Sequence, residues 1–227
     1  QILGTKMTAS TPPPSIDSDV ATALSKIEDR QIDHIFFVAC GGSLSIMHPA
    51  KFLLDQYSAA LPSDVYNAAE FTHRAPKRLT KNSLVILCSM TGTTRETVAA
   101  AEYGSKAGAL TIGLSTLVVS PLSSACDSTI SFEAPYTNGT PIDAKNSNYA
   151  RIYQLVLGIV KIFDGVDKLS KMQDSLDNLQ AAIDGAQTAF GPIFDDFAPR
   201  FAKEDVIYTM ASGASFGAAY SFSICVL

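Results

Sequence analysis

Hydroxyl side chains gather in one nine-residue stretch of the chain, between Ser89 and Thr97. The stretch holds one serine and four threonines around Gly92, between the apolar run Leu84–Cys88 and a helix expected over residues 94–107. A helix N-terminus offers free N–H groups and a positive dipole end, glycine lets the backbone approach a ligand, and hydroxyls donate hydrogen bonds. Capping the helix would use only one or two of these hydroxyls. The pattern therefore predicts a turn that binds phosphate.

A second turn of similar character, Gly41-Gly42-Ser43-Leu44-Ser45, follows the apolar run Ile35–Ala39. Parallel α/β proteins bind ligands at the carboxyl ends of their strands, so we expect both turns at one end of a sheet. The sequence contains neither a G-x-x-x-x-G-K-[ST] motif nor a G-x-G-x-x-G motif after a strand. This argues against a triphosphate or a dinucleotide and favours a monophosphate on a small molecule.

The first of these turns recurs later in the chain. Ala39–Ser43 aligns with Ala211–Ser215 at an offset of 172 residues, and a strand is expected at Val206–Met210 before the second copy. Gly213–Gly217 also matches the G-x-S-x-G pattern of a nucleophile elbow. In that fold the histidine follows the serine, whereas all three histidines here precede it. A repeated loop is therefore the better interpretation.

Continuous apolar runs separated by helical stretches are typical of strands that are buried on both faces. This alternation predicts an α/β fold with a doubly wound five-stranded parallel sheet, in a flavodoxin-like three-layer α/β/α arrangement. The strands are expected at 35–39, 65–66, 84–88, 110–114 and 129–132. The helices are expected at about 20–27, 46–60, 94–107 and 152–163, with a longer helical stripe from Leu169 to Ile183.

Four segments are expected along the chain. Residues 1–33 form an N-terminal arm, which contains Pro12-Pro13-Pro14, and a helix; residues 34–166 form the first domain. Residues 167–204 are a helical linker, and residues 205–227 begin a second domain of the same kind. Because the sequence stops at Leu227 inside an apolar helical pattern without a C-cap signal, we expect it to be truncated there.

Composition and charge limit which classes of partner the protein could bind and which cellular compartment it could occupy. The formal net charge is −5 without a dense Lys/Arg cluster, which argues against nucleic acid. No apolar run approaches the roughly 18 residues of a membrane span, and no signal-peptide pattern opens the chain. The four cysteines form no C-x-x-C pair, which favours free thiols in a reducing cytoplasm, and the three histidines lack metal-ligand spacing. We therefore expect a cytoplasmic protein with no metal, cofactor, membrane or nucleic-acid partner.

The two turns resemble the signature of the sugar isomerase (SIS) family, which includes the isomerase half of glucosamine-6-phosphate synthase. That family carries Cys-Gly-Thr-Ser after its first strand and Ser-Gln-Ser-Gly-Glu-Thr after a later one. Here these motifs appear as Cys40-Gly41-Gly42-Ser43 and Ser89-Met90-Thr91-Gly92-Thr93-Thr94, and the resemblance extends from about residue 30 to the end. It implies that Ser43, Ser89, Thr91 and Thr94 hold the phosphate of a sugar. Further substrate contacts are expected at Gly41, Gly42, Met90, Gly92, Glu70 and Ser215.

Within the family the chain most resembles deglycases of phosphorylated Amadori compounds, in Phe37–Ser43, Ser120-Pro121-Leu122 and Val206–Ala214. Such enzymes split a 6-phosphofructosyl amine into glucose 6-phosphate and the free amine. The implied chemistry is metal-free: a proton moves between C1 and C2, and the imine so formed is hydrolysed. The resemblance places the catalytic glutamate and histidine in a Gly-Glu-Phe-x-His-Gly segment, which is expected C-terminal to Leu227.

Two other functions stay open. One is an aldose–ketose isomerase that acts on an amino-sugar phosphate; the other is a sugar-phosphate sensor without catalysis. The catalytic glutamate of the synthase corresponds to Ser221, which weakens an aminotransferase interpretation. Glu70 is either a general base or a residue that orients its loop. The leading expectation is a homodimeric, or larger homo-oligomeric, deglycase of 6-phosphofructosyl amino acids.

Overall fold

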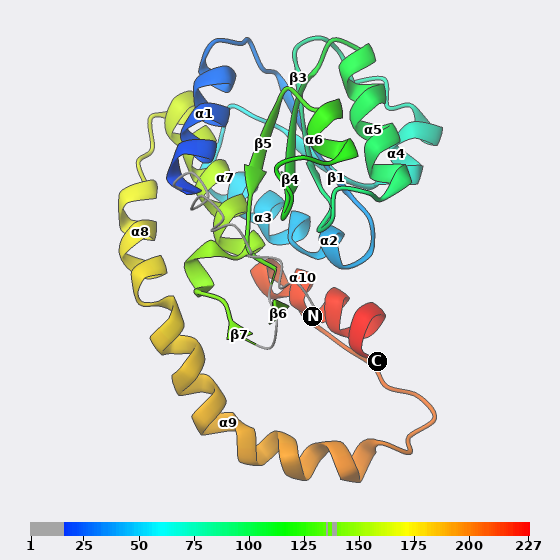
Figure 1. Cartoon of the computed structure of the whole chain (residues 1–227), viewed down its shortest axis with the longest axis vertical. Helices are drawn as coiled ribbons and strands as arrows, with labels where there is room; N and C mark the ends of the chain where they lie inside the picture. Colours follow the sequence, from blue (N-terminus) through cyan, green and yellow to red (C-terminus); the bar gives the residue numbers. More distant parts are fainter. Residues whose placement is uncertain (1–15, 135, 138–139) are drawn as a thin grey trace, which may run out of the picture.

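A five-stranded parallel sheet forms the centre of the protein, as predicted, in a computed structural model that describes residues 16–134, 136–137 and 140–227 (Figure 1). The strands lie side by side in the order β2-β1-β3-β4-β5. Their bounds are β1 His34–Ala39, β2 Ser63–Asn67, β3 Ser83–Cys88, β4 Leu110–Ser115 and β5 Ser128–Ser131. The predicted proline-containing arm lies outside the described residues.

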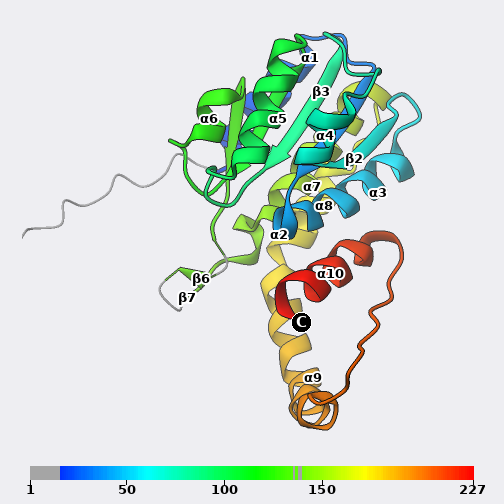
Figure 2. The ribbon, with the colours of Figure 1, turned by 90° about the vertical axis from the view of Figure 1, so that its right-hand side faces the viewer.

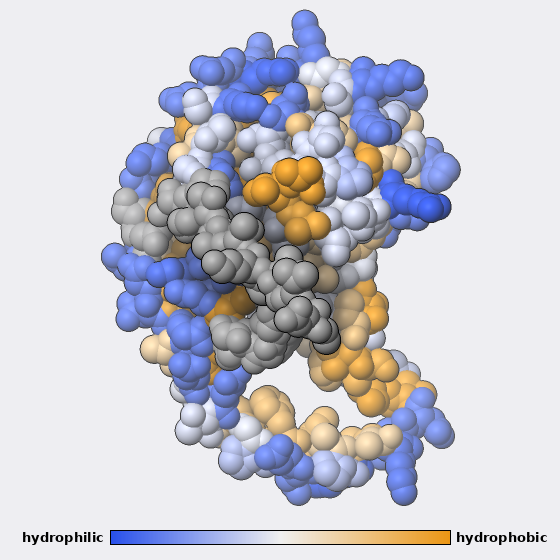
Figure 3. Space-filling model, viewed as in Figure 1, coloured by the Kyte–Doolittle hydropathy of each residue, from blue (hydrophilic) through white to orange (hydrophobic). Residues whose placement is uncertain are grey.

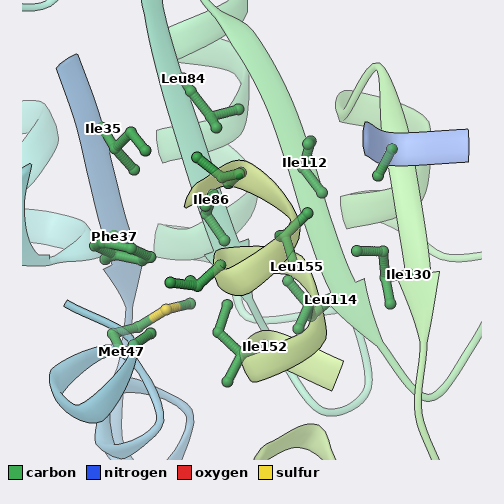
Figure 4. Packing of buried hydrophobic residues seen from close by; sticks show 14 of the residues in the cluster. Ile35, Phe37, Met47, Leu84, Ile86, Ile112, Leu114, Ile130, Ile152 and Leu155 are labelled. Carbon is green, nitrogen blue, oxygen red and sulfur yellow. The ribbon is translucent and has the colours of Figure 1, made fainter. Parts of the chain in front are cut away.

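Helices cover both faces of this sheet, because the strand side chains alternate between the two faces. Ile35 and Phe37 pack with Ile152 and Leu155 on one face, as Figure 4 shows. The helices of this face are α1 (Ile16–Glu28), α3 (Met47–Tyr57) and α7 (Asn148–Asp164). The helices of the other face are α4 (Ala68–Arg74), α5 (Arg95–Lys106) and α6 (Pro121–Ala125). Each fully buried aliphatic or aromatic side chain contributes about 1.5–3 kcal/mol to folding.

The helix expected over residues 46–60 forms as α3, and a further short helix precedes it in the segment that was expected to be a turn. A short helix, α2 (Gly41–Ser45), ends at Ile46, and α3 begins at Met47. Pro49 lies in the first turn of α3, where the backbone N–H that proline lacks would have no partner inside the helix. Between β5 and α7 the described residues form a small hairpin, β6 (Tyr136–Thr137) and β7 (Thr140–Pro141), and a 3-10 turn, η1 (Ala144–Asn146).

The strand expected at Val206–Met210 does not form, and that prediction is wrong. Tyr208 is 86% exposed and Met210 is 93% exposed, and no described strand pairs with this segment. A strand needs hydrogen bonds to a neighbouring strand, and apolar sequence alone does not supply them. The segment is therefore an extended connection that carries exposed apolar side chains.

The C-terminal third leaves the sheet, and its last part, residues 213–227 (the returning segment), comes back to helices α2 and α3. Its elements are α8 (Leu169–Asp177), α9 (Leu179–Phe201), a 3-10 turn η2 (Gly213–Ser215), α10 (Phe216–Ser221) and a π-helical turn η3 (Phe222–Val226). No residue of α9 is buried, and its exposed apolar side chains are Phe190, Ile193, Phe194 and Phe197. Figure 3 shows apolar surface on both α9 and the returning segment.

The returning segment packs against α2 and α3 (Figure 2). A methyl group on Gly217 would lie 2.0 Å from the carbonyl oxygen of Ser45, so α10 approaches the backbone of α2 without any intervening side chain. Among the described residues, no helix combines the length and apolar character that crossing a bilayer requires.

Candidate functional site

The two predicted turns meet at the point where the strand order reverses. From β1 the chain adds β2 on one side and then β3 on the other, so β1 and β3 are neighbours. Ala39 pairs with Cys88 at the carboxyl ends of these two strands. Ligands of doubly wound sheets bind at such a reversal, outside the carboxyl ends of the strands. The turns after Ala39 and after Cys88 therefore border one site.

Hydroxyls of the second turn pair with each other. Ser89 is buried, with 1% of the residue exposed, and its hydroxyl lies 2.9 Å from the Thr94 hydroxyl; the Thr91 hydroxyl lies 2.7 Å from that of Thr93. Thr94 is the N-cap residue of α5, yet its side chain makes no capping hydrogen bond. The capping hydroxyl is directed to Ser89 instead, so it does not occupy the first N–H groups of α5. The N-terminus of α5 is thus open to an anion.

The backbone of this turn is fixed by the last residue of β4 and by the segment that follows it. The carbonyl of Met90 accepts hydrogen bonds from the N–H of Thr116 (2.9 Å), the hydroxyl of Thr116 (2.7 Å) and the hydroxyl of Ser115 (3.3 Å). The carbonyl of Gly92 accepts from the N–H of Leu122 at 2.9 Å. The conformation of the turn is therefore fixed through its backbone carbonyls, and its exposed hydroxyls are not needed to hold it.

Sequence reasoning did not assign a role at this site to Ser120 and Ser123, which begin α6. Ser120 is the N-cap, Pro121 occupies the first turn, and Ser120 and Ser123 exchange hydrogen bonds in a capping box. Each residue's N–H is bonded to the other's hydroxyl, at 2.7 Å and 3.1 Å. The Ser-Pro-x-Ser pattern was the available signal for this helix start.

The first turn brings Ser43 to the end of β3. Gly41 adopts φ +52°, which favours glycine, and α2 begins there. The side chain of Ser43 lies next to the thiol of Cys88. Burial raises the pKa of Cys88 to about 12, against a smaller lowering by the Ser43 side chain. Cys88 is therefore a neutral thiol near neutral pH and is unsuited to act as a nucleophile.

The other residues that were predicted to contact the substrate do not all lie at these two turns. Glu70 is exposed on α4 and forms an ion pair with Arg74 at 2.7 Å. Ser215 is exposed at the end of η2, which packs against α3. The side chain of Met90 is 49% exposed. Thr97 is fully buried, and its hydroxyl has no hydrogen-bond partner among the described residues, so it does not face a ligand.

Comparisons with known proteins agree with this architecture. The SIS domain family model matches residues 30–158. Fructosamine deglycase FrlB of Bacillus subtilis is 42% identical over 212 residues, which cover 93% of this chain and 63% of that protein. A fructoselysine 6-phosphate deglycase of Escherichia coli O157:H7 is 36% identical over 115 residues, or 51% of this chain and 34% of that protein.

Two crystal structures share the fold over nearly the whole chain. A candidate phosphosugar isomerase from Bacillus subtilis gives a TM-score of 0.88 at 41% identity and covers 92% of this chain and 63% of its own. Another candidate phosphosugar isomerase, from Salmonella typhimurium LT2, gives a TM-score of 0.88 at 32% identity. The match covers 98% of this chain and 66% of that protein's chain. This chain thus spans less than two thirds of the length of these relatives. Since the family model matches more than half of its residues, the chain belongs to the SIS domain family.

Proposed function

We propose that the turn Ser89–Thr94 binds the phosphate group of a phosphorylated sugar. The observation that carries the proposal is the hydrogen bond between Ser89 and Thr94, which directs the capping hydroxyl of α5 away from the N–H groups of the helix. A phosphate at this end would accept from those N–H groups and from the Thr91 hydroxyl, and the positive end of the dipole favours it. Ser43 would approach the same ligand from the neighbouring strand.

The sugar is proposed to be a 6-phosphofructosyl amine, and the reaction its cleavage to glucose 6-phosphate. The support comes from the two deglycase relatives, at 42% and 36% identity. C1 and the amine nitrogen each lose a proton, and C2 and its oxygen each gain one, which converts the C1 amine and C2 ketone into a C1 imine and a C2 hydroxyl. Water then adds to C1, and the amine departs with the bonding electrons as it takes up a proton.

The role proposed for the described turn in this reaction is orientation. Holding the phosphate at one end of the sugar fixes where C1 and C2 lie, and fixed geometry is a large part of catalysis. We assign no acid or base to the turn, because its polar side chains are hydroxyls and not groups that titrate near neutral pH. A second domain that begins near residue 205 is proposed to supply the remaining part of the site.

The test is an assay of the protein with 6-phosphofructosyl-lysine and with 6-phosphofructosyl-asparagine, in which a coupled dehydrogenase detects glucose 6-phosphate. The unphosphorylated fructosyl amines are the matched controls. Release of glucose 6-phosphate from a phosphorylated compound, without turnover of its control, is expected. Turnover of glucosamine 6-phosphate alone would assign the protein to the isomerases. Binding of sugar phosphates without turnover of any would indicate a sensor, and equal binding of phosphorylated and unphosphorylated sugars would overturn the phosphate assignment.

A further inference from the structure

A cavity of about 320 Å³ lies away from the hydroxyl-rich turn, between α3, α7 and α8. Figure 2 shows these three helices beside one another on the face of the sheet that α5 does not cover. The apolar part of the cavity is formed by Leu53 of α3, Leu157 of α7 and Met172 of α8. Its volume lies at the lower end of the range for small-molecule sites, which suits a ligand of roughly one ring.

Two lysines line the cavity, and neither forms an ion pair with a carboxylate among the described residues. The ammonium of Lys168 lies 5.6 Å from the centre of the Tyr57 ring, and Lys171 is exposed on the first turn of α8. The nearby Asp167 is engaged elsewhere, since it pairs with Lys161 at 2.9 Å and accepts from the N–H of Leu169. In a chain of net charge −5, this makes the cavity locally cationic.

Tyrosine side chains add polar groups inside the same cavity. Tyr57 and Tyr153 both line it, and each is only partly exposed. Burial, with a smaller contribution from the neighbouring Tyr149, raises the pKa of Tyr153 to about 12. The Tyr153 phenol is therefore neutral and able to donate a hydrogen bond near neutral pH.

We propose that this cavity binds a small organic anion with an apolar body. The anionic group would lie at Lys168 and Lys171, and the apolar body would lie against Leu53, Leu157 and Met172. Pockets of this composition, mostly apolar with a few polar groups that fix orientation, are typical of small-molecule sites. The proposal is independent of the phosphate site, because none of these residues belongs to the hydroxyl-rich turn.

The experiment uses protein labelled with 3-fluorotyrosine and follows the resonances of Tyr57 and Tyr153, assigned with Tyr57→Phe and Tyr153→Phe. Phenylacetate and phenyl phosphate are the anionic probes, and 2-phenylethanol is the neutral control. Both anions are expected to shift these two resonances, with an affinity at least about tenfold above that of the alcohol, a difference of about 1.4 kcal/mol. Tyr66 and Tyr103, which pack on the other face of the sheet, are expected to stay unshifted.

The double variant Lys168→Gln/Lys171→Gln is expected to weaken phenylacetate binding about tenfold or more, which is the scale of losing a charge-assisted contact. The matched control Lys77→Gln/Lys106→Gln makes the same change in net charge away from the cavity and is expected to bind normally. The proposal is overturned if neither anion shifts Tyr57 and Tyr153, if the alcohol binds equally well, or if both double variants behave alike. A larger response to phenyl phosphate than to phenylacetate would identify the preferred ligand as a dianion.

Discussion

Gly92 lies directly against Ser120, so that the hydroxyl-rich turn and the start of α6 are in contact. A methyl group built on Gly92 would come within 2.2 Å of the Ser120 hydroxyl oxygen and 3.0 Å of that of Ser115. Gly92 also has φ +68°, in the left-handed region. Any side chain at this position therefore meets both a backbone penalty and a steric clash with residues that hold the turn.

Gly92→Ala is predicted to destabilise the protein and to weaken the binding of glucose 6-phosphate. The left-handed conformation alone costs a non-glycine residue about 1–2 kcal/mol. Gly165→Ala is the matched control, since Gly165 has φ +67° but no atom within 4 Å of the added methyl group. Urea unfolding of the two variants should show a larger decrease in the free energy of unfolding for Gly92→Ala than for Gly165→Ala. Equal decreases in the free energy of unfolding would mean that Ser120 can move aside at little energetic cost.

Thr91→Val is predicted to lose affinity for glucose 6-phosphate while its fold stays intact. A hydrogen bond to a charged group is worth about 1.5–3 kcal/mol, so the dissociation constant should rise by about tenfold to a hundredfold. Calorimetric titration of glucose 6-phosphate measures it, with glucose as the neutral comparison. An unchanged dissociation constant would remove Thr91 from the site.

Thr97→Val is the control for that experiment, and it carries a prediction of its own. The Thr97 hydroxyl is buried and unpartnered among the described residues, so replacing it with a methyl group should remove a desolvation penalty of about 1–3 kcal/mol. We expect equal or greater resistance to urea and unchanged ligand binding. Lower stability would show that this hydroxyl has a partner in solution, such as a bound water molecule.

The cysteines are predicted to react with Ellman's reagent in separate phases. Burial raises the pKa values of Cys88 and Cys126 to about 12, so neither forms an appreciable amount of thiolate at mildly alkaline pH. Cys225 is exposed and should react in the fast phase. Cys225→Ser should remove a fast phase, and denaturant should expose Cys88 and Cys126. Fast reaction of Cys88 in the native protein would contradict the packing at the end of β3.

Two neighbouring strands of the sheet, β1 and β3, could be predicted from the sequence because each contains a short, unbroken apolar run. The runs are Ile35–Ala39 in β1 and Leu84–Cys88 in β3, and the hydroxyls that follow them mark the end where the chain turns. The strand predicted at Val206–Met210 has the same local pattern, but a strand depends on a partner that composition does not reveal. Local sequence therefore predicts which segments are apolar, and tertiary pairing decides which become strands.

The internal arrangement of the site was less predictable. The run of hydroxyls from Ser89 to Thr97 lies at the start of α5, where a helix was expected, yet nothing in the sequence separates the exposed Thr91 from the buried Thr97. Thr97 lies in the first turn of α5 on the side that meets the core, whereas Thr91 lies in the turn before the helix begins. The contact of Ser43 with Cys88 likewise depends on strand register, which places Ala39 opposite Cys88.

Gly217→Ala is predicted to release the returning C-terminal segment from α2. Its methyl group would lie 2.0 Å from the Ser45 carbonyl oxygen, and a backbone oxygen cannot move aside as a side chain could. Limited proteolysis within 206–227 should become faster. Gly191→Ala, in the exposed part of α9 with nothing within 4 Å, is the control and should be neutral or slightly stabilising by up to about 1 kcal/mol. The same proteolysis rate in both variants would contradict close packing of α10 on α2.

The packing of this segment is also predicted to depend on pH through His48. The His48 ring lies 4.8 Å from the ring of Phe216 and 5.5 Å from that of Tyr220, and burial lowers its pKa below 6.5. When the segment detaches, the imidazole becomes solvated and binds protons more readily. The detached state therefore takes up more protons, so attachment is most stable above pH 6.5 and weakens as the pH falls through 6.5 toward the lower pKa of the packed state.

Proteolysis of the segment should accordingly accelerate on mild acidification, and this acceleration should be lost in His48→Gln, which keeps a polar side chain but cannot titrate in this range. A proton NMR titration of the His48 ring gives an independent measurement. Phe216→Ala should raise the pKa of His48 toward 6.5, because removing the ring restores solvent to the imidazole. If the pKa of His48 is the same in the wild type and in Phe216→Ala, the C-terminal segment does not bury this histidine in solution, and the pH dependence has no basis.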